Sequence, residues 1–440
     1  MIDVCIIGAG PAGLVLAREL AGSKLRVCLL ESGTKAPPLA RDPLYELHTP
    51  TLPIAHDSRV RTLGGTTATW SGRWKHLDPI DFERRAYVPH SGWPITYDEL
   101  QPFRDRADRI AGFAPVATPP PLFHGDTVIP TWFRTQPKAE RHWGKTLGAT
   151  LEVQLDAHVI RLEATSGSVT RVIARQANRE LVIAPRAVVL ATGGIENARL
   201  LLLSELGNRH DQVGRYYMDH PKSKCGMLEA YEPIERARWH SLTPDAPSYV
   251  GFRIADDVQR RHGLLNSHVL LQPLFERDLV NRLVRRVREP AECRLFAIRS
   301  YLEQAPDPAN RVTLHTDLDP LGLRKASVQW SIGVQDLESI TVLHEQLARE
   351  LQRAGIGELE SPLLHGAPLD DLGDASHHMG TTRMGTDPQT SVVDASCRVH
   401  DLANLFVAGS SLFPTGGYAN PTATLVALAI RLADHLKDSL

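Results

Sequence analysis

Cysteine is scarce in this sequence, and apolar runs of membrane length are missing from it. The 440 residues include five scattered cysteines (Cys5, Cys28, Cys225, Cys293 and Cys397), so neither a disulfide framework nor a C-x-x-C site is predicted. No apolar run approaches the roughly 20 residues that a membrane span requires. The predicted first strand starts at Ile2, which leaves no room for a leader segment. We therefore expect a cytoplasmic protein without a membrane span.

Excess charge and metal-binding motifs are also missing. Lys and Arg number 49, Asp and Glu number 51, and the formal net charge is -2. Such a balance gives no overall field that would attract nucleic acid, so nucleic acid is not an expected partner. Neither H-E-x-x-H nor a Cys/His ligand spacing occurs, and no metal site is predicted.

Several short apolar segments predict a parallel sheet. Residues 2–7 and 26–31 are nearly all apolar, as parallel strands covered on both faces are, and residues 11–21 between them have helical spacing. Together they predict one βαβ unit. Residues 186–191 and 404–409 have the same character, which indicates that the chain returns to this sheet twice. A chain of this length can bury two cores.

A different pattern begins near residue 225. Alternating strands are predicted at 248–254, 311–314 and 326–332, followed by a helix over 336–354. The sequence therefore predicts an α/β fold with two domains. A discontinuous, Rossmann-like dinucleotide-binding domain comprises residues 1–224 and 380–440, and a second domain, residues 225–379, is built on a largely antiparallel β-sheet.

A glycine motif follows the first predicted strand. Gly8, Gly10 and Gly13 have the G-x-G-x-x-G spacing, which permits a tight turn, a close approach to a pyrophosphate and packing of helix on strand. Glu31 ends the second strand, where an acid can accept hydrogen bonds from ribose hydroxyls. Two later strands end in the small-residue turns 191–194 and 408–411. An extended cofactor needs such repeated close approaches, which favours FAD over NAD.

Three further segments carry a family resemblance: GGTTATWSG at 64–72, HHMGTTRMG at 377–385 and PTGGYANPT at 414–422. With these segments the sequence resembles the glucose-methanol-choline (GMC) oxidoreductases, and most closely their pyranose oxidase-like branch. The resemblance implies FAD as cofactor. It places His377 at the catalytic histidine of the H-x-x-G-T-x-R-M-G motif and Asn420 at the second catalytic position, which is His or Asn before Pro.

The resemblance also concerns how FAD is held. Where pyranose oxidase and choline oxidase have a histidine joined covalently to the flavin, this sequence has Thr69, which implies non-covalent FAD. The residues expected at the cofactor are Gly8, Gly10, Pro11, Ala12, Gly13, Glu31, Gly64, Gly65, Thr69, Trp70, Ser71, Val159, Ala191, Thr192, Gly193, Gly409, Ser410, Pro421 and Thr422.

The chemistry of the residues agrees with this resemblance. An alcohol gives up hydride readily only as its oxygen loses a proton, so a base must lie within hydrogen-bond reach of the hydroxyl. The imidazole of His377 can take that proton near neutral pH. The amide of Asn420 can hold the developing alkoxide with its N–H donors. Two alternatives stay open, namely that His378 is the base and that the two histidines are a loop pair without function.

We therefore predict oxidation of a secondary alcohol of a sugar, glycoside, cyclitol or similar polyol, with oxygen, a quinone or another compound as electron acceptor. The alternatives are a non-redox FAD lyase of the hydroxynitrile lyase kind and a non-catalytic flavoprotein that serves as a binding module. An amphipathic stripe with arginines on its other side, near 275–288, predicts a covering helix, a docking helix or a substrate lid.

Overall fold

The computed structural model of the protein describes residues 2–37, 42–114, 122–123, 125–177, 179–241, 248–274 and 292–440. The amphipathic stripe predicted near 275–288 lies outside the described residues.

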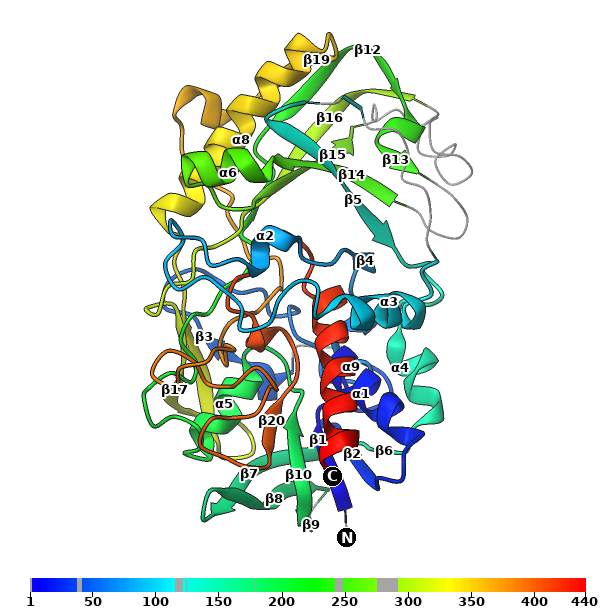
Figure 1. The fold of residues 1–440 in the computed structure, drawn as a ribbon, viewed down its shortest axis with the longest axis vertical. Coiled ribbons are helices and arrows are strands. Elements are labelled where there is room, and N and C mark those ends of the chain that lie inside the picture. Colours follow the sequence, from blue (N-terminus) through cyan, green and yellow to red (C-terminus); the bar gives the residue numbers. More distant parts are fainter. Residues whose placement is uncertain are drawn as a thin grey trace.

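A five-stranded parallel sheet occupies the lower half of the molecule in Figure 1. Its strand order is β20-β10-β1-β2-β6, and every neighbouring pair is parallel. The central strands are buried almost completely, which explains their apolar sequences. The strands are β1 (Ile2–Ile7), β2 (Val27–Leu30), β6 (Val153–Gln154), β10 (Pro185–Leu190) and β20 (Leu405–Val407).

Segments that are distant in the sequence meet in this sheet. Strand β10 pairs with β1 on one side and with β20 on the other, so the start, the middle and the end of the chain form one layer, as the sequence predicts. Helix α1 (Pro11–Ala21) packs against the closing helix α9 (Thr422–Ser439), which also contacts α3 (Gln101–Ile110). Both chain termini lie at the lower end of the molecule in Figure 1.

A nine-stranded antiparallel sheet forms the upper half of the molecule (Figure 1). Helix α8 (Val334–Arg353) packs against β19, β5 and β14 of this sheet. The main path runs β19-β12-β16-β15-β14-β5-β4, with β11 and β13 at its margins. The strands are β4 (Arg73–Trp74), β5 (Val128–Thr135), β11 (Lys222–Ser223), β12 (Met227–Glu235), β13 (His240–Ser241), β14 (Ser248–Ile254), β15 (His268–Pro273), β16 (Glu292–Tyr301) and β19 (Gly357–Glu360).

Some segments lie in a different unit from the one expected. Strand β5 pairs with β14 through residues 128–134, so it belongs to the antiparallel sheet although its residues precede 224. Strands β17 (Arg311–Leu318) and β18 (Arg324–Gln329) instead pair with each other, and β18 also pairs with β3 (Leu47–His48). Both strands contact α5 (Glu196–Leu203). The domain limits at 224 and 379 thus remain a proposal. In that division, β5 would be counted with the second domain, and β17 and β18 with the first.

The remaining elements connect these layers. A separate three-stranded sheet contains β7 (Ala157–Thr165), β8 (Ser168–Gln176) and β9 (Arg179–Ile183). Short helices are α2 (Pro79–Phe82), α4 (Trp143–Thr146), α6 (Asp256–His262), η1 (Pro43–Tyr45), η2 (Gly65–Ala68), η3 (Gly148–Thr150), η4 (Arg236–Arg238), η5 (Pro362–His365) and η6 (Ser410–Leu412).

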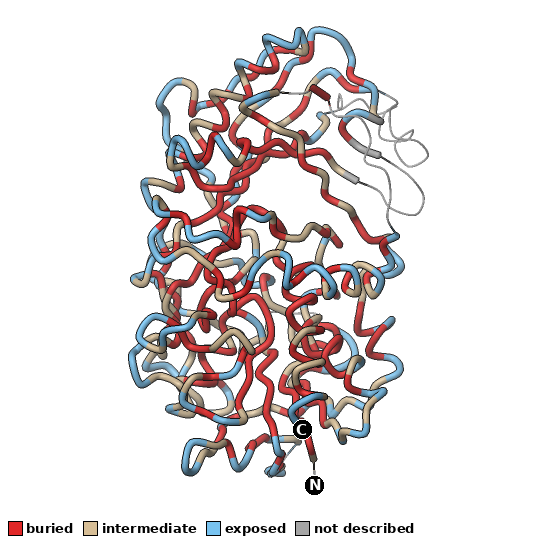
Figure 2. The backbone as a smooth tube through the Cα atoms, viewed as in Figure 1, coloured by how far each residue is buried: buried red, intermediate tan, exposed pale blue. Residues whose placement is uncertain are grey.

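Burial follows the two layers (Figure 2). One large apolar core surrounds the parallel sheet, and a second lies between the antiparallel sheet and α8. All five cysteines are buried and free. Among the helices of the described residues, none has both the length and the apolar character that crossing a membrane would require.

Candidate active site

A cavity of about 520 Å³ lies at the carboxyl ends of the parallel strands. Its lining includes Gly8 after β1, Glu31 after β2, Ala191 after β10 and Ala408 after β20. The carboxyl ends of parallel strands are where open α/β sheets bind their ligands, because the connecting turns leave a crevice there. Segments of the antiparallel half close the cavity from the other side, through residues such as Arg73 and Lys222.

Most residues predicted from the sequence line this cavity, including His377 and Asn420. Gly13 and Gly64 do not. A Cβ added to Gly13 would lie 1.9 Å from the carbonyl oxygen of Gly8, so this glycine lets helix α1 pack on its strand. Gly64 has φ +98°, and a Cβ there would lie 2.5 Å from the backbone nitrogen of Gly144. Both positions require glycine for local packing. Their place at the cofactor stays a prediction.

Three other glycines leave backbone open toward the cavity. A Cβ added to Gly10 or Gly193 would meet no atom within 4 Å, and one at Gly409 would meet only the side-chain nitrogen of Asn197 at 3.9 Å. All three line the cavity. Together they form a cradle that side chains would fill, at the N-terminus of α1 where a pyrophosphate is favourably bound. This arrangement fits an extended dinucleotide.

Glu31 is held rigidly at the predicted ribose position. Its carboxylate accepts hydrogen bonds from the backbone N–H groups of Ala9 (2.8 Å) and Gly33 (2.7 Å). Burial raises the pKa of Glu31, and these two hydrogen bonds partly offset that effect. Each carboxylate oxygen keeps a further lone pair, so Glu31 can still accept from ribose hydroxyls.

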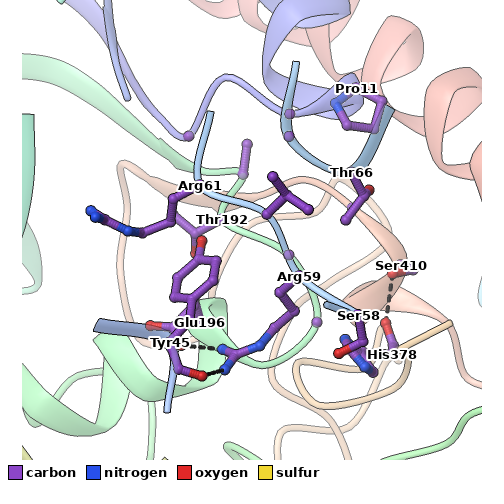
Figure 3. Close-up of a pocket in the computed structure, with 18 of the residues that line it drawn as sticks. Pro11, Tyr45, Ser58, Arg59, Arg61, Thr66, Thr192, Glu196, His378 and Ser410 are labelled. Carbon is purple, nitrogen blue, oxygen red and sulfur yellow. Dashed lines mark hydrogen bonds and ion pairs between the residues drawn. The ribbon is translucent and has the colours of Figure 1, made fainter. Parts of the chain in front are cut away.

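Two arginines that the sequence analysis missed also line this half of the cavity (Figure 3). Arg59 donates to the Glu196 carboxylate and to the Tyr45 carbonyl, both at 2.5 Å, and its guanidinium lies 4.5 Å from the Tyr45 ring centre. Arg61 donates to Asp42 at 2.7 Å. An Arg-x-Arg pair shortly before Gly64 was the available signal, but nothing in the spacing shows that both side chains face the cavity.

At the other end of the cavity, the predicted residues His377 and Asn420 lie close to a third residue, His220. His377 lies in the loop before β20, and Asn420 lies just before α9. The amide nitrogen of Asn420 donates to Nε2 of His377 at 3.1 Å. Nδ1 of His377 lies 2.9 Å from Nδ1 of His220, a residue that was not among the predicted site residues.

Asp219 fixes the loop that carries His377. Its carboxylate accepts backbone N–H groups from His220 (2.6 Å), Ala375 (3.0 Å) and His377 (3.1 Å). Asp219 is fully buried. Burial, with the nearby carboxylate of Asp374, raises the pKa of Asp219 to about 7. The two histidines are therefore anchored through one carboxylate although they are far apart in sequence.

The hydrogen bonds define the tautomers of both rings. Nε2 of His220 lies 3.3 Å from the carbonyl oxygen of Gly416, an atom that can only accept, so this nitrogen carries the proton. In neutral His220 the other nitrogen, Nδ1, must then accept from Nδ1–H of His377. Nε2 of His377 is left with a lone pair, which agrees with its acceptance of the Asn420 amide N–H. The basic nitrogen of His377 therefore points toward Asn420.

Both rings are neutral near pH 7. Burial lowers the pKa of His220 to about 4. For His377, burial and then the positive charges of neighbouring side chains lower the pKa well below the ordinary value. A neutral His377 is the form that can accept a proton.

The neighbouring His378 occupies a different position. It is buried, lines the cavity and packs near Tyr217, and its Nε2 has no hydrogen-bond partner among the described residues. Its carbonyl oxygen accepts from the Ser410 hydroxyl at 2.7 Å (Figure 3). Ligand atoms of His378, Asp219 and Asp374 lie within 4.8 Å of one another. Both carboxylates already accept backbone N–H groups, which accounts for their placement without a cation.

Arg383 and His400 lie outside the cavity lining. The Arg383 guanidinium donates to the His90 carbonyl at 2.5 Å and lies 4.4 Å from the Tyr216 ring centre. Nε2 of His400 is 2.8 Å from the Ser391 hydroxyl. The Arg383 guanidinium thus binds a backbone carbonyl and a tyrosine ring outside the cavity lining.

Comparison with known proteins decides the family. Residues 306–429 match the family described as GMC oxidoreductase, and residues 2–224 match the family described as pyridine nucleotide-disulphide oxidoreductase. The chain belongs to the GMC oxidoreductase family. It is an FAD-dependent oxidoreductase, and FAD is the cofactor that the glycine cradle and Glu31 fit.

Relatives and solved structures agree with this membership. The chain is 24% identical to 2-methyl-1,2-propanediol dehydrogenase of Mycolicibacterium austroafricanum, over 99% of this chain and 95% of that protein. A stretch of 60 residues is 48% identical to pyranose 2-oxidase of Tricholoma matsutake, covering 14% of this chain and 11% of that protein. The crystal structure of a formate oxidase superposes with a TM-score of 0.69 at 18% identity, covering 100% of this chain and 98% of that chain, which shows the shared fold.

The sequence resemblance places Thr69 at the position where some GMC members attach their flavin. It lines the cavity, and its hydroxyl donates to the Thr66 carbonyl at 3.3 Å. A threonine cannot supply the imidazole that such a covalent link requires. The expectation of non-covalent FAD therefore stands as a prediction with a direct test.

Proposed function

We propose that this protein oxidises a secondary alcohol of a sugar, glycoside, cyclitol or similar polyol, with His377 as the base. The observation that carries the proposal is the hydrogen-bonded series Gly416–His220–His377–Asn420, which presents a lone pair on Nε2 of His377 beside an amide donor. That combination suits removal of a proton from a hydroxyl group held between the two side chains.

His377 would take the hydroxyl proton on Nε2. Its Nδ1–H already donates to His220, so the imidazolium that forms keeps a hydrogen bond at Nδ1 without rearrangement. That bond becomes charge-assisted as the ring gains its proton, and such bonds are stronger than neutral ones. His220 is therefore a positioning residue in this proposal, since it acts through His377. The backbone N–H groups of His220 and His377 both donate to the Asp219 carboxylate, which keeps the two rings in position.

Asn420 would hold the reacting oxygen. Its amide nitrogen carries two hydrogens, one of which is directed at His377, so the second can donate to the developing alkoxide. When bound, FAD supplies the hydride acceptor of the reaction. The residues of this chain thus handle the proton and the position of the substrate oxygen.

Polyols are favoured as substrates for a physical reason. The Asn420 amide has an acceptor as well as donors, so a vicinal diol can satisfy both of its ends, whereas an isolated alcohol leaves one unpaired. Two relatives named above support this class, since their names give a vicinal diol and a pyranose as substrates. The electron acceptor is proposed only as oxygen, a quinone or another acceptor.

An anaerobic substrate screen tests the proposal. Sugars, glycosides, cyclitols and aliphatic alcohols are mixed with the holoenzyme without oxygen, and loss of the oxidised flavin absorbance is followed. A polyol or glycoside should reduce the flavin faster than a simple aliphatic alcohol. A hydroxynitrile lyase would turn over its substrate without net bleaching, and a binding module would show neither reaction. Faster reduction by sterol-like or long-chain alcohols than by every polyol would overturn the substrate class alone.

A further inference from the structure

We propose that Arg73 and Lys222 form a carboxylate subsite beside the reaction centre, so that the preferred substrate is an acidic polyol such as a uronate, an aldonate or a uronic acid glycoside. This inference rests on the proposed function, because it names the substrate class of the same site.

The two cations come from one face of the antiparallel sheet. Arg73 lies on β4, and its guanidinium donates to the Tyr301 hydroxyl at 3.1 Å. Lys222 on β11 is directly opposite Tyr301 on β16, and directly opposed residues of antiparallel strands project to the same face. Both cations line the cavity that contains His377 and Asn420. Tyr301 thus stands between two positive side chains that share the space of the reaction centre.

The cationic side chains that line the cavity fall into two groups, those with an acidic ion-pair partner in the described part of the chain and those without one. The first group includes three arginines: Arg59 pairs with Glu196, Arg61 with Asp42, and Arg199 with Asp319. Arg73 and Lys222 have no ion-pair partner among the residues that the structure describes. Arg73 is half-buried, and a charge removed from water without a partner is costly. An anionic ligand would supply that partner.

These positive charges act on the groups around them. Burial alone would raise the pKa of Tyr301, yet Arg73 and Arg299 bring it below the ordinary value. After burial and the other histidines, Lys222 and Arg73 also contribute to the lowered pKa of His377. A carboxylate bound between the cations would offset these two contributions, while those of burial and of the other histidines would remain.

A carboxylate suits this pair of side chains. The planar guanidinium of Arg73 can donate two parallel N–H bonds to a carboxylate, and the ammonium group of Lys222 adds a point charge. His377 and Asn420 require a hydroxyl in the same molecule. The substrate must then carry a carboxylate and a secondary alcohol on one small frame, as sugar acids do.

Matched substrates test the proposal on the holoenzyme. Methyl α-D-glucopyranoside and methyl α-D-glucopyranosiduronate differ only at C6, which is a hydroxymethyl group in the first and a carboxylate in the second. The uronoside should show a kcat/KM for anaerobic flavin reduction about tenfold higher or more, on the scale of a charge-assisted hydrogen bond. Added salt should shrink this advantage, because Lys222 is exposed and its charge is screened. Equal rates for the two glycosides would overturn the proposal.

Variants locate the effect. Arg73→Gln and Lys222→Gln should each raise the ratio of KM for the uronoside to KM for the neutral glycoside about tenfold. Lys224→Gln is the matched control, since Lys224 is two residues from Lys222, exposed, and outside the cavity lining. Equal slowing of both glycosides by Arg73→Gln would refute the subsite, because it would mean that the cation serves the cofactor or the fold.

A binding measurement separates this inference from the proposed function. Tetrahydropyran-2-carboxylate has no hydroxyl to oxidise, and its methyl ester is neutral. Calorimetry on the holoenzyme should show binding of the acid at least about tenfold tighter than the ester, and Lys222→Gln should abolish the difference. Absence of flavin reduction by any alcohol would end the proposed function, whereas equal binding of acid and ester would end this inference alone.

Discussion

Replacing His220 tests the proposed role of the hydrogen-bonded series most directly. In the resting protein, Nδ1–H of His377 donates to a neutral nitrogen of His220, a bond of about 0.5–1.5 kcal/mol. When His377 gains a proton, the same bond is made by a cation and contributes about 1.5–3 kcal/mol. The difference, about 1–1.5 kcal/mol, is realised only as the proton is transferred. It corresponds to about a tenfold change in rate.

His220→Ala should therefore slow substrate-driven flavin reduction about tenfold, or somewhat more if His377 also changes tautomer. The assay is anaerobic stopped-flow measurement of flavin absorbance at saturating substrate. His220→Gln is the matched rescue, because its amide oxygen can accept from His377 while its nitrogen donates to the Gly416 carbonyl. We expect His220→Gln to recover a substantial part of the rate.

A purely structural role of His220 would give a different pattern. Both variants would then lose FAD or thermal stability in parallel with rate, and Gln would rescue neither. FAD content and the melting temperature of each variant are the control measurements. A His220→Ala enzyme with full FAD content and an unchanged reduction rate would refute the reasoning.

Four further predictions follow from the site. His377→Ala should retain FAD yet slow flavin reduction about 100-fold or more, which is the usual effect of losing a general base. His378→Ala should affect the rate much less. Reversed effects would show that His378 is the base. Gly10→Val should yield colourless protein, because its side chain would fill the pyrophosphate position. Heat or acid should release all FAD into the supernatant, since Thr69 cannot link it; flavin that precipitates with the chain would contradict this. Because the pKa of His377 lies below the ordinary 6.5, the reduction rate should be flat between pH 7 and 8 and fall only on the acid side, so a rise through pH 7 would contradict a neutral base.

The parallel sheet and its cofactor turns could be predicted because their signals are local. A strand buried on both faces must be apolar, and a backbone that approaches a pyrophosphate must lack side chains. Both requirements can be read from consecutive residues such as 2–10. The same holds for helix α9, whose apolar spacing predicts it over nearly its whole length.

Strand partners could not be predicted in the same way. An alternating pattern shows that a segment is a strand with one buried face, but it does not say which strand lies beside it. Strand β5 thus joined the antiparallel sheet, and β17 and β18 joined β3, against the expected division. Arg59 and Arg61 could not be predicted as cavity residues for a related reason, because an Arg-x-Arg pair occurs equally well on a solvent-exposed surface.

The role inferred for His220 shows why the site needed a structure. His220 and His377 are held together by one buried carboxylate, that of Asp219, which binds the backbones of both, and by the backbone pairing of Met218 with Met379. The pKa of about 4 makes His220 an acceptor at every working pH, so it does not compete with His377 for the substrate proton. If His220 titrated near 7, its protonated form would face His377 with a donor and oppose the gain of a second charge. Burial of His220 is therefore what allows a histidine, rather than a carboxylate, to support the base.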